Sequence, residues 1–310
     1  MHSAILTRLR GGSAVSLGRI ASGRASIVSA FDARTPHPLW IAKTARRPED
    51  VQRLRNEYEA LTYLAPWCRE LGIPEVLEWE AAGGQAVLIQ SGVRGRREKI
   101  SLPINAGDAD LRRSFQDALA WVRQFQAKVP LRAAMPAGTL AERYIEDLSR
   151  RSVFGGGLSG LMDVLRRHGA AGRRSAVPVH GDFHPTNVLF VRPGLSVVDW
   201  SAFGPGFPLQ DAFSFLVNSD YSRRGHICHL IENYHHVFFS DSRVNGLVRQ
   251  QMEADGSSGD ESRFLFYCFL ATQICADAVT PPQYWLDIVR YLEPFEFPGP
   301  CTPLPAPRVE

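Results

Sequence analysis

A chain of 310 residues has room for two modest domains or for one enzyme with two lobes. Apolar residues make up 45% of it and charged residues 22%, which excludes wholesale disorder. Five cysteines without a C-x-x-C pair argue against a zinc site or a disulfide framework and favour a reducing, cytoplasmic location. No apolar run reaches the roughly 18 residues of a membrane helix, so we expect no membrane anchor.

Charge is spread unevenly along the chain. The net charge is +3, yet residues 201–310 hold 13 acidic and 7 basic side chains, a net −6, which leaves +9 for residues 1–200. A basic half suits either nucleic acid or the phosphates of a nucleotide. Because the sequence has no arginine-rich helix and no RNA-binding motif with interleaved aromatic residues, nucleic acid is the weaker alternative.

The N-terminal 31 residues permit two interpretations. Several arginines and serines, with no acid before Asp32, are typical of a transit peptide. Alternating apolar residues are typical of strands, and this interpretation is favoured because residues 24–31 and 38–44 extend it into a meander. Gly23 falls in the turn before residues 24–31. Such a glycine can let backbone N–H groups approach phosphates, but it stands outside any G-x-G-x-x-G motif, and an ordinary hairpin turn explains it equally well.

Lys43 lies near the end of the strand predicted at residues 38–44. Its run, W-I-A-K, resembles the strand lysine that contacts the α- and β-phosphates in kinases. The apolar stripe of residues 48–71 predicts a long helix that begins with Pro48. This helix carries Glu57 as the expected partner of Lys43 and Glu59 as the competing one. A solvated surface pair is an equal alternative.

Two more strands are predicted at residues 75–80 and 85–90, around a glycine turn. The run that follows at residues 91–99, S-G-V-R-G-R-R-E-K, is basic and broken by glycines, which favours a hinge between lobes. We expect the backbone between Gln90 and Gly92 to face the edge of a nucleotide base. The arginines of this run are solvated or, as the lesser alternative, bind an anionic substrate.

From residue 100 onward the hydrophobic period is that of helices. Helices are predicted at residues 109–129, 139–152, 158–168, 225–240, 261–278 and 282–292. Aromatic residues of the last three segments can stack on a sugar or a nucleoside, although most are expected in the core. They include Tyr234, Phe264, Tyr267, Tyr284 and Trp285.

Residues 179–200, V-H-G-D-F-H-P-T-N-V-L-F-V-R-P-G-L-S-V-V-D-W, hold the densest set of chemically useful side chains. Asp182 can accept the proton of an attacking hydroxyl, and Asn187 follows it on the same loop. A hairpin then delivers Asp199 at the end of an apolar strand. Because amide and carboxylate oxygens can hold Mg²⁺ on nucleotide phosphates, the spacing predicts phosphoryl transfer to a hydroxyl.

Two alternatives compete for the same stretch. His180, Asp182 and His184 form H-x-D-x-H, which can bind a transition metal as in a hydrolase. That interpretation leaves Asn187 and the downstream V-V-D-W unexplained, and no other cluster of histidine and cysteine lies nearby. A polar turn without function is the second alternative, against which several matching spacings argue. We expect His180 to hold the loop by hydrogen bonding rather than to take part in chemistry.

The run H-G-D-F-H-P-T-N-V-L-F followed by V-V-D-W resembles the signature of the aminoglycoside phosphotransferase/choline kinase (APH) family of small-molecule kinases. The D-x-x-x-x-N spacing is shared with protein kinases, whereas D-W in place of D-F-G is similar to the small-molecule branch. The resemblance covers most of the chain. It implies a catalytic role for Asp182 and metal binding by Asn187 and Asp199. It also implies nucleotide binding by Lys43 and Glu57.

The same resemblance implies an α+β fold of the bilobal, protein-kinase-like kind. Residues 1–91 would form a small β-rich N-lobe with one long helix, and residues 92–99 a hinge. Residues 100–310 would form a larger, mostly helical C-lobe that carries the catalytic residues and the acceptor. Asp211 matches an acid whose role in that family is chiefly structural. The turn at Gly23 departs most from the kinase pattern.

The implied reaction moves the γ-phosphoryl group of ATP, or GTP, to a hydroxyl of a small molecule, with Mg²⁺. The acidic C-terminal third favours a cationic acceptor such as an aminoglycoside, whereas the pI of about 8.7 argues against a strongly polycationic one. A sugar, a nucleoside or another natural product is as credible. The alternative is a catalytically silent, kinase-like nucleotide-binding or regulatory protein, against which the intact set of polar residues argues.

Overall fold

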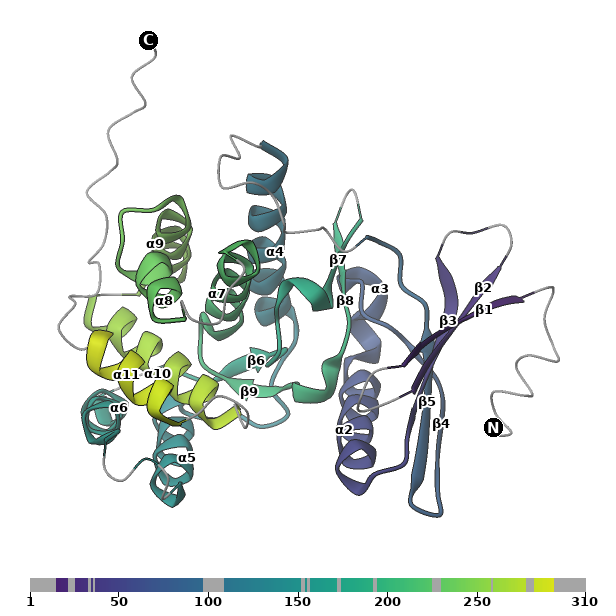
Figure 1. The fold of residues 1–310 in the computed structure, drawn as a ribbon, viewed down its shortest axis with the longest axis horizontal. Coiled ribbons are helices and arrows are strands. Elements are labelled where there is room, and N and C mark those ends of the chain that lie inside the picture. The colour runs from purple at the N-terminus through teal and green to yellow at the C-terminus, as the bar shows by residue number, and fades with distance from the viewer. Residues whose placement is uncertain are drawn as a thin grey trace, which may run out of the picture. The chain divides into compact units, whose positions relative to one another are not determined.

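The computed structural model describes most of the chain. Described are residues 15–21, 26–32, 35, 37–96, 109–151, 154, 157–171, 174–191, 194–224, 230–257, 259–276 and 282–292. Gly23, predicted to lie in a turn between strands, falls outside this part. A small antiparallel sheet lies near the N-terminus and helices make up most of the C-terminal part (Figure 1), which confirms the predicted α+β class.

The chain divides into two compact units, each discontinuous in sequence. Unit 1 consists of Met1–Lys99, Asn105–Pro130 and His180–Gly204, and unit 2 of Ile100–Ile104, Leu131–Val179 and Pro205–Glu310. The division into an N-lobe, a hinge and a C-lobe at residues 1–91, 92–99 and 100–310 stays a prediction. All residues predicted for the chemistry belong to unit 1.

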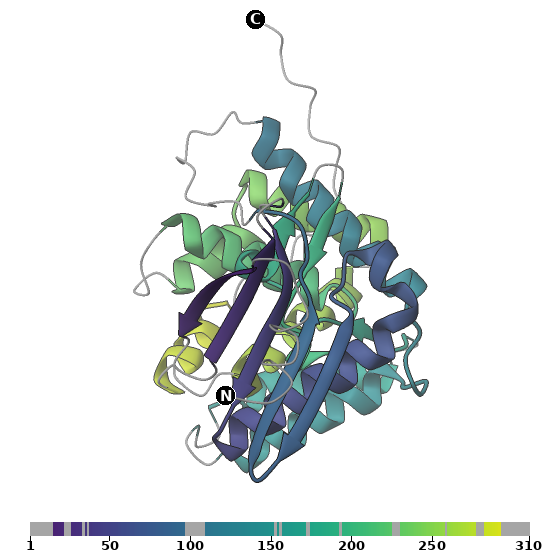
Figure 2. The ribbon, with the colours of Figure 1, turned by 90° about the vertical axis from the view of Figure 1, so that its right-hand side faces the viewer.

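Unit 1 contains a five-stranded antiparallel sheet in the order β1-β2-β3-β5-β4 (Figure 2). Its strands are β1 (Val15–Ala21), β2 (Ser26–Asp32), β3 (Pro38–Ala45), β4 (Val76–Ala82) and β5 (Gln85–Ser91). Trp40 of β3 packs with Ile89 of β5 on one face, and strand alternation therefore places Lys43 on the other face. Gly83 and Gly84, both at positive φ, form the tight turn between β4 and β5.

Helix α2 (Pro48–Leu64) packs on the sheet, on the face that carries Lys43. Pro48 begins the helix where a missing N–H is harmless, and two acids lie at its positive end. The sequence predicted one helix over residues 48–71, but α2 ends at Leu64. The reason is Pro66, which has no N–H to continue the helix. A 3-10 turn, η1 (Ala65–Trp67), and a short helix, α3 (Cys68–Leu71), follow.

Helix α4 (Ala109–Lys128) and the hairpin of β7 (Val188–Phe190) and β8 (Leu195–Val197) also belong to unit 1. The indole N–H of Trp121 on α4 donates to the carbonyl of Leu71 over 2.9 Å. Gly72 turns the chain at a φ of 64°, and a Cβ there would overlap the carbonyl oxygen of Leu195. These contacts hold α3, α4 and the hairpin together.

Unit 2 is mainly helical. Its helices are α5 (Ala137–Arg150), α6 (Ser159–Ala171), α7 (Gln210–Arg224), α8 (Leu230–Phe238), α9 (Arg243–Asp255), α10 (Gly259–Ala276) and α11 (Pro282–Leu292). Two short strands form a two-stranded sheet: β6 (Val177–Val179), and β9 (Gly204–Gly206), whose first residue is assigned to unit 1. Helix α10 is buried around most of its circumference and packs on α5, α6 and α7, as an interior helix of a bundle does.

Helix α9, whose residues are largely polar, was not among the helices predicted from the sequence. Local capping starts and ends it: the side-chain oxygen of Ser242 accepts the N–H of Asn245 over 3.0 Å, and Gly256 follows at a φ of 70°. Arg174 joins the end of α9 to the start of α10, because its guanidinium lies 2.5 Å from both Asp255 and Glu261.

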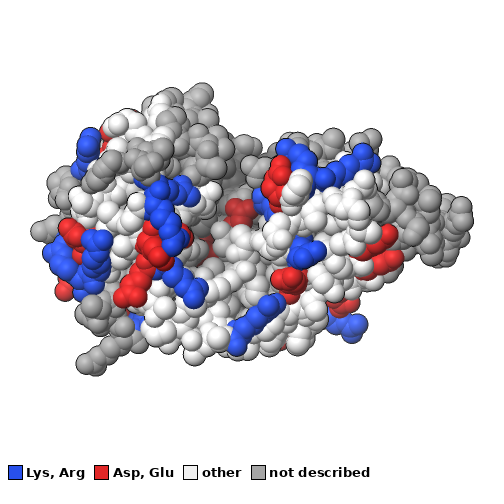
Figure 3. Space-filling view, turned by 90° about the horizontal axis from the view of Figure 1, so that it is seen from below, with Lys and Arg blue, Asp and Glu red and all other residues white. Residues whose placement is uncertain are grey.

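In the described part of the chain, none of the helices has both the length and the apolar character of a membrane span. On the face of the molecule shown in Figure 3, basic and acidic side chains are interspersed. Among the residues described there, no single sign of charge covers an extended area. A nucleic-acid-binding surface requires such a basic area, so this face gives no support to that alternative.

Candidate active site

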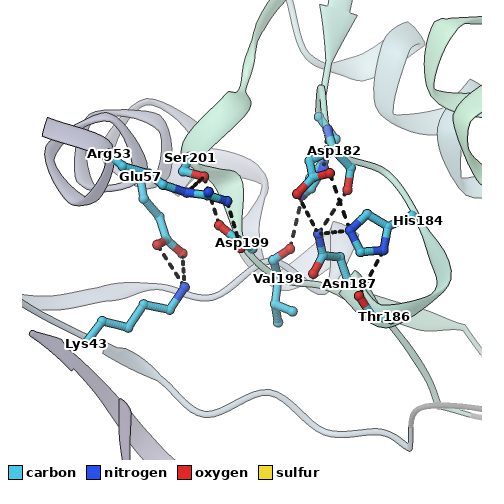
Figure 4. Close-up of polar contacts among 11 residues, drawn as sticks. Lys43, Arg53, Glu57, Asp182, His184, Thr186, Asn187, Val198, Asp199 and Ser201 are labelled. Atoms are coloured by element: carbon cyan, nitrogen blue, oxygen red, sulfur yellow. Dashed lines mark hydrogen bonds and ion pairs between the residues drawn. The ribbon is translucent and has the colours of Figure 1, made fainter. Parts of the chain in front are cut away.

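Lys43 and Glu57 form a bidentate ion pair. The Lys43 ammonium lies 2.6 and 2.8 Å from the two carboxylate oxygens of Glu57 (Figure 4). Only 13% of the Lys43 side chain and 3% of the Glu57 side chain are exposed, so the pair is largely removed from water. Glu59, the competing partner in the sequence, is on the exposed side of α2. The pairing follows from geometry, since Glu57 belongs to the buried stripe of α2.

Asp182 and Asn187 are joined within one short loop. The amide nitrogen of Asn187 donates to the main-chain carbonyl of Asp182 over 2.9 Å and to its carboxylate over 3.3 Å (Figure 4). Asn187 is buried and ends the 3-10 turn η3 (Pro185–Asn187), whereas 38% of the Asp182 side chain is exposed. A buried amide thus fixes a carboxylate that still faces solvent.

His180 anchors the same loop from within. It is fully buried, one ring nitrogen lies 3.1 Å from the carbonyl of Val198, and the other accepts the N–H of Asp182 over 3.2 Å. Burial is the main cause that lowers the pKa of His180 to about 4, so the ring is neutral at neutral pH. Both nitrogens are occupied by hydrogen bonds, as expected for a residue that holds the loop. This geometry argues against the H-x-D-x-H metal site.

Gly181 permits the close approach of two segments that sequence reasoning did not connect. Its φ is 81°, and a Cβ at this position would overlap the carbonyl oxygen of Ala202 in the 3-10 turn η4 (Trp200–Ala202). The loop that carries Asp182 therefore packs directly on the turn that follows Asp199. A side chain at residue 181 would separate them.

Asp199 combines an unusual backbone conformation with contacts to two side chains. It adopts a φ of 66°, a left-handed conformation that few residues other than glycine tolerate. One carboxylate oxygen accepts the Ser201 hydroxyl over 2.9 Å, and the other lies 3.4 Å from the Arg53 guanidinium (Figure 4). Arg53 also donates to Ser201 over 3.0 Å. The sequence analysis did not identify Arg53 or Ser201, because neither belongs to a recognisable motif.

Opposing effects act on the pKa of Asp199. Burial acts to raise it, but the positive charges of Lys43 and Arg53 and the hydrogen bond from Ser201 outweigh burial, and the net effect is a lowered pKa. Asp199 is therefore an anion at physiological pH.

Aromatic rings support both acidic loops. Trp121 of α4 stacks on Phe183, with ring centroids 5.4 Å apart, and meets Trp200 at 6.2 Å. Phe183 and Trp200 directly follow Asp182 and Asp199 in the sequence, and both are fully buried. A single indole thus helps to fix the positions of two carboxylates that lie far apart in the chain.

Gln90 and Gly92 lie at the end of β5 and just beyond it. Gln90 is 1% exposed, and its side-chain oxygen has no hydrogen-bond partner among the residues that the structure describes. The N–H of Gly92 donates to the carbonyl of Leu39 over 2.9 Å, and a Cβ at Gly92 would overlap the carbonyl oxygen of Pro38. Glycine at residue 92 therefore has a packing reason that involves no ligand. The contact of this segment with a nucleotide stays a prediction.

The donor set at Asn187 and Asp199 fits a hard cation such as Mg²⁺. Because the amide nitrogen of Asn187 is engaged by Asp182, its oxygen is the atom left to bind a metal. Asp199 adds a charged oxygen. Within the described residues, no cluster of three or more histidine, cysteine or acidic side chains forms a site for a softer metal.

Solved structures of aminoglycoside phosphotransferases share the fold of this chain. APH(4)-Ia matches with a TM-score of 0.60 and 15% identity, over 93% of this chain and 98% of that one. APH(3'')-Id from Streptomyces rimosus ATCC10970 matches with a TM-score of 0.55 and 19% identity, over 87% and 97%. The structure of its complex with ADP and streptomycin matches with a TM-score of 0.56 and 18% identity, over 87% of this chain and 97% of that one. These matches confirm the predicted kinase-like fold.

At the level of sequence, curated proteins yield no significant match to this chain. A family model does match it, over residues 20–244, and is described as the phosphotransferase enzyme family, APH. This span covers most of the chain and includes the whole candidate site from Lys43 to Asp199. The chain therefore belongs to the APH phosphotransferase family, as its sequence signature predicted.

Proposed function

We propose that this protein transfers the γ-phosphoryl group of ATP or GTP to a hydroxyl group of a small molecule, with Mg²⁺. The observation that carries the proposal is the hydrogen-bonded pair of Asp182 and Asn187, which shares unit 1 with Asp199 and the Lys43–Glu57 ion pair. Membership of the APH family supports the reaction class. The complex of APH(3'')-Id with ADP and streptomycin supports a nucleotide and a hydroxylated small molecule as substrates.

In this proposal Asp182 is the general base. The proton of the acceptor hydroxyl passes to its carboxylate while the acceptor oxygen bonds to the γ-phosphorus. The bond from the γ-phosphorus to the bridging oxygen breaks, and the nucleoside diphosphate leaves. Asp182 suits this role because its carboxylate is partly exposed, yet is held by the buried amide of Asn187.

Asn187 and Asp199 are the proposed metal ligands. When bound, Mg²⁺ neutralises the charge of the nucleotide phosphates. The lowered pKa of Asp199 keeps its carboxylate charged, and the hydrogen bonds of Asn187 orient its oxygen away from Asp182.

Lys43, oriented by Glu57, is the proposed contact to the nucleotide phosphates. The backbone near Gln90 and Gly92 is the proposed contact to the base, and Gly23 a further candidate at the phosphates. In lobe terms, residues 1–91 bind the nucleotide, residues 92–99 are the hinge, and residues 100–310 bind the acceptor. We propose the cytoplasm as the location, since the described cysteines are free.

The decisive experiment is a turnover screen. Purified protein is incubated with ATP or GTP and with aminoglycosides, neutral sugars, nucleosides and other hydroxylated natural products, with Mg²⁺ or with a chelator. Release of nucleoside diphosphate and gain of one phosphoryl group by the acceptor are both measured. Turnover that requires an acceptor, Mg²⁺ and Asp182 supports the proposal. Nucleotide binding without turnover on any acceptor would favour a catalytically silent protein instead.

Asp182→Asn is the matched variant for this screen, because it keeps the shape of the side chain and removes its basicity. We expect it to bind nucleotide like the natural protein and to lose turnover. Asp163→Asn, an exposed carboxylate on α6, is the control and should leave turnover unchanged.

A further inference from the structure

His184 contacts the candidate base directly. Its Nε2 lies 3.3 Å from one carboxylate oxygen of Asp182, and its Nδ1 lies 2.9 Å from the hydroxyl of Thr186 (Figure 4). The same Nε2 is 3.3 Å from the amide nitrogen of Asn187. His184 is thus in contact with three polar groups within its own loop, but neutral histidine has only one N–H to donate.

The hydrogen bonds of the neighbours decide which nitrogen carries the proton. Asn187 has two N–H groups on its amide nitrogen, and two oxygens of Asp182 already accept from that nitrogen, at 2.9 and 3.3 Å. The second N–H faces two acceptors at 3.3 Å, the carboxylate of Asp182 and Nε2 of His184, and the charged carboxylate is the stronger acceptor. If that nitrogen lacked a proton, its lone pair would face the carboxylate of Asp182 and repel it. A proton on Nε2 turns the same 3.3 Å contact into a charge-assisted hydrogen bond.

The hydroxyl of Thr186 completes this arrangement. With the proton on Nε2, Nδ1 of His184 is an acceptor, and the Thr186 hydroxyl can donate to it over 2.9 Å. With the opposite tautomer the hydroxyl would accept instead, and Nε2 would be left without a proton beside a carboxylate. Thr186 is exposed and His184 is 26% exposed, so neither residue is required to fill a core.

We propose that Thr186 and His184 are positioning residues that orient the carboxylate of Asp182. Thr186 donates to Nδ1, which favours the Nε2–H form of His184, and His184 then donates to one carboxylate oxygen of Asp182. Asn187 donates to the other oxygen. Held at both oxygens, the carboxylate has a fixed plane, and the remaining lone pairs point in defined directions. This inference rests on the proposed role of Asp182 as the general base.

The tautomer can be read without any turnover. Long-range ¹H–¹⁵N spectra of protein labelled at histidine distinguish Nε2–H from Nδ1–H, and His184→Gln assigns the signal. For the neutral ring we expect Nε2–H at His184 and a shift of its proton in Asp182→Asn. Thr186→Val should increase the share of the other tautomer. A dominant Nδ1–H form in the natural protein overturns the inference.

Kinetics then separate positioning from substrate binding. On an acceptor found in the turnover screen, His184→Leu should lower kcat by about 10- to 100-fold with little change in the KM of the nucleotide. His184→Gln places an amide N–H near Nε2 and should recover most of the loss. Thr186→Val should lower kcat by a smaller factor, and Thr186→Ser should restore it. Thr62→Val, an exposed threonine on α2, is the control and should have no effect.

The outcomes of the two experiments are distinct. A raised KM for the nucleotide with unchanged kcat would mean that His184 binds substrate, which overturns positioning. Equal loss in the leucine and glutamine variants would also overturn it. If no acceptor supports turnover but the spectra show the Nε2–H form bonded to Asp182, the proposed function is wrong. The hydrogen bond from His184 to Asp182 is then still confirmed.

Discussion

Arg53 and Glu57 lie one helical turn apart on α2, and each contacts an oppositely charged residue of the candidate site. Glu57 holds the Lys43 ammonium at 2.6 Å, and Arg53 lies 3.4 Å from the carboxylate of Asp199. One helix therefore sets the position of a proposed phosphate contact and of a proposed metal ligand. A shift of α2 along its axis would disturb both.

Removal of Arg53 is expected to raise the affinity of the protein for a divalent metal. In Arg53→Gln the carboxylate of Asp199 loses a competing cation, so Mn²⁺ or Mg²⁺ should bind about two- to five-fold more tightly, in keeping with a partly exposed ion pair. Titration followed by calorimetry, or by the Mn²⁺ spin signal, measures this. Arg55→Gln, on the exposed side of the same helix, is the control. Weaker metal binding in Arg53→Gln would show that Arg53 supports the ligand rather than competes for it.

Removing one charge of the Lys43–Glu57 pair should destabilise the protein more than replacing both residues by apolar ones. Glu57→Gln leaves a nearly buried ammonium without its counter-charge. We therefore expect the free energy of unfolding, measured in urea, to fall by about 3 kcal/mol. The double variant Lys43→Met, Glu57→Leu removes both charges and should recover part of that stability. Additive losses in the double variant would contradict a direct coupling. Both variants should lose affinity for nucleotide, which fluorescence titration can test.

Gly181 offers a test of the close packing at the catalytic loop. Gly181→Ala combines a left-handed φ with overlap against Ala202, whereas Gly84→Ala has a similar φ of 74° and no atom of a described residue within 4 Å of its Cβ. The control should lose about 1 kcal/mol of stability from backbone strain alone. Gly181→Ala should lose clearly more and should also lower turnover on any active acceptor. Equal losses would show that the approach to Ala202 is unimportant. Chemical denaturation of the two variants side by side decides this.

His180 should make stability depend on pH between about 6.5 and 4. Its pKa is about 4 in the folded protein against an ordinary value near 6.5, so the unfolded chain binds a proton that the folded chain excludes. Above pH 6.5 this group therefore leaves the free energy of unfolding unchanged. As the pH falls below that value the free energy of unfolding decreases, by about 2 kcal/mol at pH 5. Denaturant unfolding at several pH values measures the slope. In His180→Gln the part of the slope due to this group should vanish, and an unchanged slope would exclude burial of a neutral ring.

For the central loop, the spacing of residues in the sequence was enough to predict which side chains lie together. Asp182 and Asn187 are five residues apart, a distance that one turn closes, so their hydrogen bond follows from neighbouring residues alone. Lys43 and Glu57 were also within reach of sequence reasoning, because strand alternation and helix period each place them on a defined face. The resemblance to the APH signature supplied the roles that we propose for these residues.

Other features depend on contacts that no local pattern encodes. Arg53 meets Asp199 across 146 residues of sequence, and Trp121 meets Phe183 and Trp200 from a helix that reads as ordinary core. The positive φ of Asp199 likewise could not be predicted from the local sequence. Helix α9 is different, because a local signal is present: Val244, Val248 and Met252 recur every four residues and are all buried, but the many polar residues between them obscured this stripe.

The discontinuity of unit 1 has a consequence for synthesis on the ribosome. Its third segment, His180–Gly204, supplies Asp182, Asn187 and Asp199, so the unit cannot be completed while the chain is shorter than about 200 residues. The 146 residues between Arg53 and Asp199 take roughly 7 to 30 s to translate at typical rates. Once it has been made, Trp121 lacks the rings of Phe183 and Trp200 until those residues are translated as well. Nascent chains should therefore pass through a stage that is sensitive to proteases and dependent on chaperones.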